Sequence, residues 1–130
     1  MALILFVDDD PDIVEAGSIV LESAGHTVVA AHNREDGMAA VRSKNPDLLI
    51  LDVMMQEPDD GIAMAVDLRK AGFKKPILML TSLSKVVGYS YGREDDVVPV
   101  DDFQEKPIEP AALVAKVNEL LATKLVAKER

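Results

Sequence analysis

Carboxylate side chains follow two of the apolar runs in the sequence, at the points where those runs end. Asp8 and Asp9 come directly after residues 3–7, and Asp52 comes directly after residues 48–51. Carboxylates held close together repel one another unless a cation lies among them. Mg²⁺ prefers one or two carboxylates, waters and phosphate oxygens as ligands, and a carboxylate can itself attack phosphorus to form an acyl phosphate. These residues therefore indicate Mg²⁺-dependent phosphoryl transfer to an aspartate.

A hydroxyl and an amino group follow two later stretches. Thr81 comes after the apolar run 77–80, and Lys106 comes just after the weakly apolar residues 102–104. Phosphoryl transfer depends mainly on positioning and charge neutralisation, so Lys106 can pair with one phosphoryl oxygen and Thr81 can donate to another. Each residue alone is as easily explained as a helix cap or a turn residue. The prediction rests on the whole set, each member at the end of its own run.

The elements that would position these groups alternate along the chain. Continuous apolar runs, typical of strands buried on both faces, lie at 3–7, 28–31, 48–51 and 77–80. Segments with helical periodicity lie at 12–24, 33–44, 60–71 and 110–128. The polar stretch 102–104 predicts an edge strand. This alternation predicts an α/β fold whose parallel sheet is covered by helices on both faces, with ligands bound beyond the carboxyl ends of the strands.

Local signals sharpen some of these elements. Asp10 and Asp12 are expected to cap the helix 12–24, and Asn33 to cap the next one. The apolar stripe of the helix 12–24 is expected to consist of Ile13, Ala16, Val20, Leu21 and Ala24. The stripe of the helix 110–128 is expected to consist of Leu113, Val114, Val117, Leu120, Leu121 and Leu125. Between 83 and 101, closely spaced glycines and Pro99 predict an irregular or shortened helix.

Composition restricts the class of protein. The chain has 130 residues, enough for one domain, with a formal net charge of −9, which argues against a nucleic-acid partner. It has no cysteine, so disulfides and thiol chemistry are excluded. His26 and His32 are expected to be surface loop residues without a metal role. No apolar stretch is long enough to cross a membrane, so the expected location is the cytoplasm, without membrane contact.

Four signatures together resemble the receiver domain of two-component response regulators. They are the residues FVDDDP at 6–11, PDLLILD at 46–52, PILMLT at 76–81 and DDFQEKP at 101–107. The resemblance covers nearly the whole chain. It implies a single receiver domain over residues 1–130 with no effector domain. It also implies a doubly wound, flavodoxin-like fold with five parallel strands in the order 2-1-3-4-5.

The resemblance implies a role for each residue of the acidic group. Asp52 is the phosphoacceptor, charged by the phosphohistidine of a sensor histidine kinase or histidine phosphotransfer protein. Asp9, Asp52 and the backbone carbonyl of Met54 bind Mg²⁺ directly, and Asp8 acts through the water shell of the metal. The chain is then a signalling domain, not an enzyme with an external substrate, although it catalyses its own phosphorylation and slow dephosphorylation.

The resemblance also implies how the phosphoryl group is sensed. Thr81 and Lys106 contact the phosphoryl group, and Phe103 changes its packing together with Thr81. Phosphorylation would shift an equilibrium between two conformations, and the signal would pass to an unknown downstream protein by protein–protein contact or through a phosphorelay. Met54 and Leu83 stand where family members influence hydrolysis, and neither can orient a water. We therefore expect a long-lived phosphoryl group.

The sequence departs from the family pattern in the loop after the acceptor. Gln56 stands where a proline is usual, and the turn before Gly61 is one residue longer. Two alternatives remain open. The run Asp8 to Asp10 also resembles the start of haloacid-dehalogenase-like phosphohydrolases, with Asp8 as nucleophile and Asp10 as acid and base. A receiver-fold scaffold that acts without phosphorylation is the other.

Overall fold

The computed structural model describes residues 2–53, 55, 60–81, 100–105 and 109–129. In chain order, the elements are β1 (Leu3–Val7), α1 (Pro11–Ser23), β2 (Thr27–Ala31), α2 (Arg34–Lys44), β3 (Leu48–Asp52), α3 (Asp60–Lys70), β4 (Ile77–Thr81), β5 (Asp102–Glu105) and α4 (Pro110–Glu129). The five strands form one parallel sheet in the order β2-β1-β3-β4-β5. The predicted sheet, its strand order and the position of 102–105 at an edge are confirmed.

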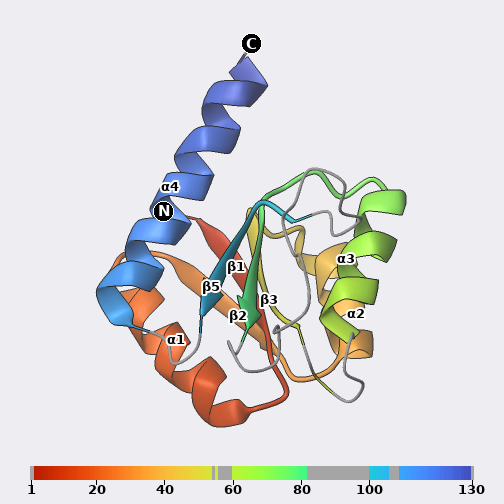
Figure 1. Cartoon of the computed structure of the whole chain (residues 1–130), viewed down its shortest axis with the longest axis horizontal. Helices are drawn as coiled ribbons and strands as arrows, with labels where there is room; N and C mark the ends of the chain where they lie inside the picture. The colour runs from red at the N-terminus through yellow and green to blue at the C-terminus, as the bar shows by residue number, and fades with distance from the viewer. Residues whose placement is uncertain (1, 54, 56–59, 82–99, 106–108, 130) are drawn as a thin grey trace.

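The central strands are buried on both faces, because consecutive side chains of a strand point to opposite sides. Ile4 and Phe6 of β1 pack with α1 and α4, whereas Leu5 and Val7 pack with α2 and α3. Figure 1 shows the two pairs of helices on opposite sides of the sheet. The continuous apolar runs are thus explained by two cores that share one sheet.

The strand β2 differs from the expectation that it is buried on both faces. Ala31 is buried, but Val28 and Val29 are half-buried and Ala30 is exposed. The reason is its place at the edge of the sheet, where it pairs with β1 on one side.

The apolar stripe predicted for α1 was partly wrong. Leu21 is buried as expected, but Ala16 and Ala24 are exposed, and the inward positions are Val14 and Gly17. A Cβ atom at residue 17 would lie 2.3 Å from the Phe6 ring, so the glycine makes room for that ring. Gly17 has no side chain whose hydrophobicity could mark it as buried, so the apolar pattern of the sequence could not identify this position.

The helix ends follow the predicted signals. Asp10 is the N-cap of α1, and its side chain accepts a hydrogen bond from the amide of Asp12. Asn33 caps α2 in the same way through the amide of Asp36, at 2.7 Å. Gly72 follows α3 with a φ of 99°, a left-handed conformation that favours glycine.

The helix α4 buries Leu113, Val117 and Leu120, as predicted. Val114 and Leu121, which were predicted on the same apolar face, are only half-buried. The side chain of Leu125 lies outside the described part of the chain. The end of α4 projects beyond the sheet (Figure 1). In the described residues, none of the helices is both long and apolar enough to span a membrane.

The prediction that His26 is a surface residue was wrong. The side chain is 8% exposed, its Nδ1 accepts a hydrogen bond from the amide of Ala2, and its Nε2 lies 3.0 Å from Oδ1 of Asn118 in α4. Since Nδ1 accepts, Nε2 carries the hydrogen and donates to Asn118. His26 therefore ties the start of β1 to α4. His32 is exposed, as expected.

Candidate acidic site

The register of the sheet brings the acidic residues of β1 and β3 to the same edge. Val7 pairs with Leu51, so Asp8 and Asp52 occupy the next position on neighbouring strands. The amide of Asp8 donates to the carbonyl of Ala31 at 3.1 Å, which extends the contact between β1 and β2 by one residue. The parallel topology alone thus places both carboxylates beyond the carboxyl ends of the central strands.

Asp8, Asp9 and Asp52 form a compact acidic cluster, and this name is used for these three residues below. One carboxylate oxygen of each lies within 4.8 Å of the others. Asp8 is fully buried, Asp52 is 4% exposed, and Asp9 is exposed. Oδ1 of Asp8 accepts a hydrogen bond from the amide of Asp10 at 2.9 Å, which fixes the orientation of that carboxylate.

The donor set of the acidic cluster fits a hard divalent cation. Its oxygens all come from carboxylates, the ligands that Mg²⁺ and Ca²⁺ prefer, and they lie close enough to contact one ion together. Two of the three groups are buried, where repulsion between like charges is screened least. A bound cation would remove this repulsion.

Gly61 packs directly on the backbone of Asp52 and was not singled out by the sequence. A Cβ atom at residue 61 would lie 1.9 Å from the carbonyl oxygen of Asp52, so only glycine fits there. The Gly61 amide donates to the carbonyl of Val53 at 2.8 Å. The first turn of α3 therefore supports the backbone of Asp52 from one side. Its sequence signal was the pair Asp60–Gly61 at the end of the loop.

Arg34 and His32 are two further residues beside the site that the sequence did not reveal. Arg34 forms an ion pair with Asp67 in α3, and its Nη1 lies 4.0 Å from Oδ1 of the buried Asp60. Nδ1 of His32 lies 3.2 Å from the backbone carbonyl of Asp8. These contacts join residues that are far apart in sequence.

The other predicted site residues are described in part. Thr81 ends β4 at the same edge of the sheet, one residue beyond the rung that pairs Asp52 with Leu80. Phe103 pairs with Met79 and is half-buried against the core on the α2 and α3 face. Met54, Lys106, the side chain of Thr81 and most of the segment 83–101 lie outside the described residues. Their predicted roles are untested by the geometry.

Comparisons with known sequences agree with this arrangement. The family model for the response regulator receiver domain matches residues 4–118. The alkaline phosphatase synthesis transcriptional regulatory protein PhoP of Bacillus subtilis is 35% identical over 122 residues, which are 91% of this chain and 48% of that protein. The DNA-binding response regulator MtrA of Mycolicibacterium smegmatis is 37% identical over 115 residues, 88% of this chain and 48% of that protein. The chain spans about half the length of these curated relatives.

Solved structures show the same fold. NtrX from Brucella abortus is 26% identical and matches with a TM-score of 0.85 over 98% of this chain and 28% of the NtrX chain. A CheY-like receiver domain protein from Methanospirillum hungatei is 24% identical, with a TM-score of 0.80 over 100% of this chain and 99% of that one. The second likeness concerns the fold alone.

Proposed function

The chain belongs to the response regulator receiver domain family, and on this premise we propose that Asp52 accepts a phosphoryl group from a phosphohistidine in a Mg²⁺-dependent reaction. The observation that carries the proposal is the acidic cluster, in which carboxylate oxygens at the carboxyl ends of β1 and β3 come within 4.8 Å of one another. The phosphorylated domain then signals through protein–protein contact or passes its phosphoryl group along a relay.

In the proposed reaction, a carboxylate oxygen of Asp52 attacks phosphorus while the bond from phosphorus to the donor imidazole breaks. The bonding electrons return to the imidazole nitrogen, which takes up a proton as it leaves. Mg²⁺ held by Asp9, Asp52 and the Met54 carbonyl would neutralise charge on the phosphoryl oxygens, with Asp8 acting through the water shell of the metal. Gly61 keeps the backbone of Asp52 in place, and Lys106 and Thr81 are proposed to contact the phosphoryl oxygens.

The phosphohydrolase alternative gives Asp10 a catalytic role, and the geometry disfavours it. The Asp10 side chain accepts the amide hydrogen of Asp12 as the N-cap of α1, so it is already engaged in starting a helix. Oδ1 of Asp8, the alternative nucleophile, is engaged as the acceptor for the Asp10 amide. Family membership likewise favours Asp52 as the acceptor.

The partners follow from the same proposal. The donor is a sensor histidine kinase or a histidine phosphotransfer protein. The downstream protein recognises the phosphorylated form of this domain. The formal net charge of −9 supports the expectation that this domain does not bind nucleic acid by itself. A cytoplasmic location and slow self-dephosphorylation also stay predictions, the second because Met54 and Leu83 cannot orient a water.

Labelling with acetyl phosphate and Mg²⁺, followed by intact-mass measurement, tests the acceptor. We expect one phosphoryl group on the unmodified protein and none on the Asp52→Asn variant. Asp47→Asn is the matched control, because it makes the same chemical change at the other end of the sheet, and it should be labelled normally. Labelling that survives Asp52→Asn but not Asp8→Asn would support the phosphohydrolase instead.

The labelled protein also tests the switch and the lifetime. Once labelling stops, the phosphoryl group should decay slowly in the presence of Mg²⁺, and a half-life of seconds would contradict the role assigned to Met54 and Leu83. A downstream partner should bind the labelled and unlabelled forms with different affinities. Equal affinities would favour the scaffold that acts without phosphorylation.

A further inference from the structure

We propose that His32 and Arg34, at the junction of β2 and α2, are positioning residues that hold the two halves of the acidic cluster at the spacing that Mg²⁺ requires. The proposal deepens the proposed function and rests on it for the identity of the ion. Neither side chain is suggested as a ligand. His32 contacts the backbone of Asp8 on the β1 side, whereas Arg34 contacts side chains of α3, whose first turn lies against the backbone of Asp52.

His32 supports the β1 half of the cluster. Its Nδ1 lies 3.2 Å from the carbonyl oxygen of Asp8. A carbonyl can only accept, so the ring nitrogen must carry the hydrogen and donate it. The amide of Asp8 donates to Ala31, the residue just before His32, at 3.1 Å. Both polar groups of the Asp8 backbone are thus held by the end of β2.

Arg34 supports the β3 half through the start of α3. Its guanidinium pairs with Asp67 and lies 4.0 Å from Asp60, two carboxylates seven positions apart on one helix. Asp60 is 8% exposed and immediately precedes Gly61. Because Gly61 lies against the Asp52 carbonyl and donates to Val53, a shift at the start of α3 would reach the acceptor backbone directly.

The two supports belong to one short piece of chain. His32 and Arg34 are separated by Asn33, whose side chain caps α2 and fixes the local backbone through the Asp36 amide. Residues 32–34 therefore link the backbone of Asp8 to α3, whose Gly61 lies against the backbone of Asp52. Carboxylates that repel one another tend to move apart, and such a link opposes that movement before a cation arrives. Replacing residues that orient the ligands of a metal typically lowers its affinity for the site.

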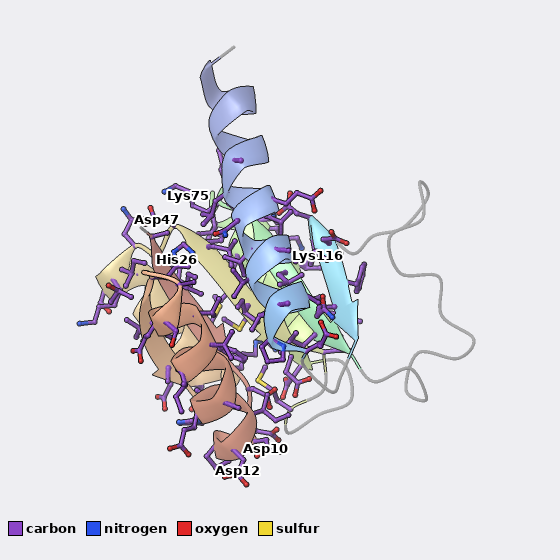
Figure 2. All side chains as sticks on the ribbon, turned by 90° about the vertical axis from the view of Figure 1, so that its left-hand side faces the viewer. Asp10, Asp12, His26, Asp47, Lys75 and Lys116 are labelled. Atoms are coloured by element: carbon purple, nitrogen blue, oxygen red, sulfur yellow. The ribbon has the colours of Figure 1, made fainter. Side chains whose placement is uncertain are left out.

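The direction in which Mg²⁺ affinity changes when the charge of Arg34 is removed distinguishes a positioning role from a purely electrostatic effect. Arg34 is a cation near a site proposed to bind a cation, so removing its charge should by itself strengthen Mg²⁺ binding. A positioning role predicts the opposite, since the cluster loses its shape. Lys75 offers a matched control, because it pairs with Asp47 at 3.5 Å at the other end of the domain. Figure 2 shows Asp47 and Lys75 at the opposite end from Asp10 and Asp12, which lie at the start of α1 just after the cluster residue Asp9.

The test is the Mg²⁺ affinity of the folded domain, measured by titration calorimetry and by the shifts of backbone amide signals in NMR spectra. We expect Arg34→Gln to weaken Mg²⁺ binding by about three- to tenfold, Arg34→Lys to restore part of the loss, and Lys75→Gln to stay within about twofold of the unmodified protein. His32→Ala removes the contact with the Asp8 carbonyl and should weaken binding by about threefold. Thermal unfolding establishes that each variant is folded, and the milder His32→Ala and Arg34→Lys variants carry the test if Arg34→Gln does not fold.

The outcomes distinguish this proposal from the function on which it rests. If Arg34→Gln and His32→Ala bind Mg²⁺ as tightly as the unmodified protein, or more tightly, the positioning role is overturned and the proposed function stands. If the unmodified protein shows no Mg²⁺ binding that Asp52→Asn weakens, the proposed function and this proposal fail together. A loss in Arg34→Gln that Lys75→Gln matches would reduce the effect to general destabilisation and would also overturn the proposal.

Discussion

The two ends of the sheet use aspartate in opposite ways. At the amino end, Asp47 and Asp101 each have complementary partners. Asp47 accepts the amide hydrogen of Leu3 and pairs with Lys75, and Asp101 accepts the amide of Ile77 and pairs with Arg69. At the carboxyl end, Asp8, Asp9 and Asp52 lie close to one another, so that like charges are neighbours.

This difference shows which end stabilises the fold and which end can do chemistry. Carboxylates at the amino end each join two or more segments of chain, so they lower the free energy of the folded state. Like charges gathered at the carboxyl end repel one another, and a bound cation would offset that repulsion. That repulsion is confined to the acidic cluster, and the fold is stabilised by the two hydrophobic cores and by the contacts at the amino end of the sheet.

The largest expected effect contrasts two glycines at the two ends. Gly61→Ala places a Cβ 1.9 Å from the Asp52 carbonyl oxygen and should lower the free energy of unfolding by about 3 kcal/mol and impair Mg²⁺ binding. Gly72→Ala has open space, but its φ of 99° disfavours alanine, so it should cost about 1 kcal/mol. Urea unfolding measures both. Equal costs, or intact Mg²⁺ binding in Gly61→Ala, would contradict the proposed contact with the acceptor backbone.

The next effect is stabilisation by Mg²⁺, which should arise at the carboxyl end alone. An ion that binds the folded protein at a hundred times its Kd raises the free energy of unfolding by about 2.7 kcal/mol. The rise should disappear in Asp52→Asn and persist in Asp47→Asn, as measured by urea unfolding with Mg²⁺ and with a chelator. Stabilisation that survives Asp52→Asn would place the ion elsewhere.

Asp101 tests the amino end by itself. Its Oδ2 accepts from the Ile77 amide at 2.8 Å and from Arg69 Nη2 at 2.9 Å, which joins the starts of β4 and β5 to the end of α3. Asp101→Ala should lower the free energy of unfolding by about 2 kcal/mol, with Mg²⁺ affinity changed less than twofold. A large loss of Mg²⁺ affinity would show that the two ends are coupled more strongly than the contrast implies.

The sequence predicts the acidic cluster well because one topological rule suffices. In a parallel sheet of this order, residues at the carboxyl ends of β1 and β3 must become neighbours; Asp8 and Asp9 directly follow β1, and Asp52 is the last residue of β3. Helix caps such as Asp10 and Asn33 are equally accessible, since their partners are two or three residues away.

What the sequence could not reveal depends on contacts between distant residues. His26 is buried because it meets Asn118, 92 positions away, and Arg34 meets Asp67 across 33 positions. Gly17 and Gly61 matter for packing because they have no Cβ atom. Neither hydropathy nor charge therefore identifies them in the sequence. At all four positions the contact is set by how distant elements align with one another, and the local sequence pattern contains little information about that alignment.

The smallest effect is also the most direct test of the contrast, because one chemical change should have opposite signs at the two ends. In Mg²⁺-free buffer, Asp9→Asn removes one of three neighbouring like charges and should raise the free energy of unfolding by about 0.5 kcal/mol. Asp47→Asn keeps an acceptor for the Leu3 amide but loses the charge that pairs with Lys75, so it should lower the same quantity by about 0.5 kcal/mol.

Salt separates these electrostatic effects from changes in packing. Both shifts should shrink in about 1 M NaCl, where the screening length is about 3 Å, and the two variants should then converge on the stability of the unmodified protein. Urea unfolding at low and high salt measures all four values. If Asp9→Asn lowers stability at low salt, or if either shift persists undiminished at high salt, repulsion within the acidic cluster is not what distinguishes the two ends of the sheet.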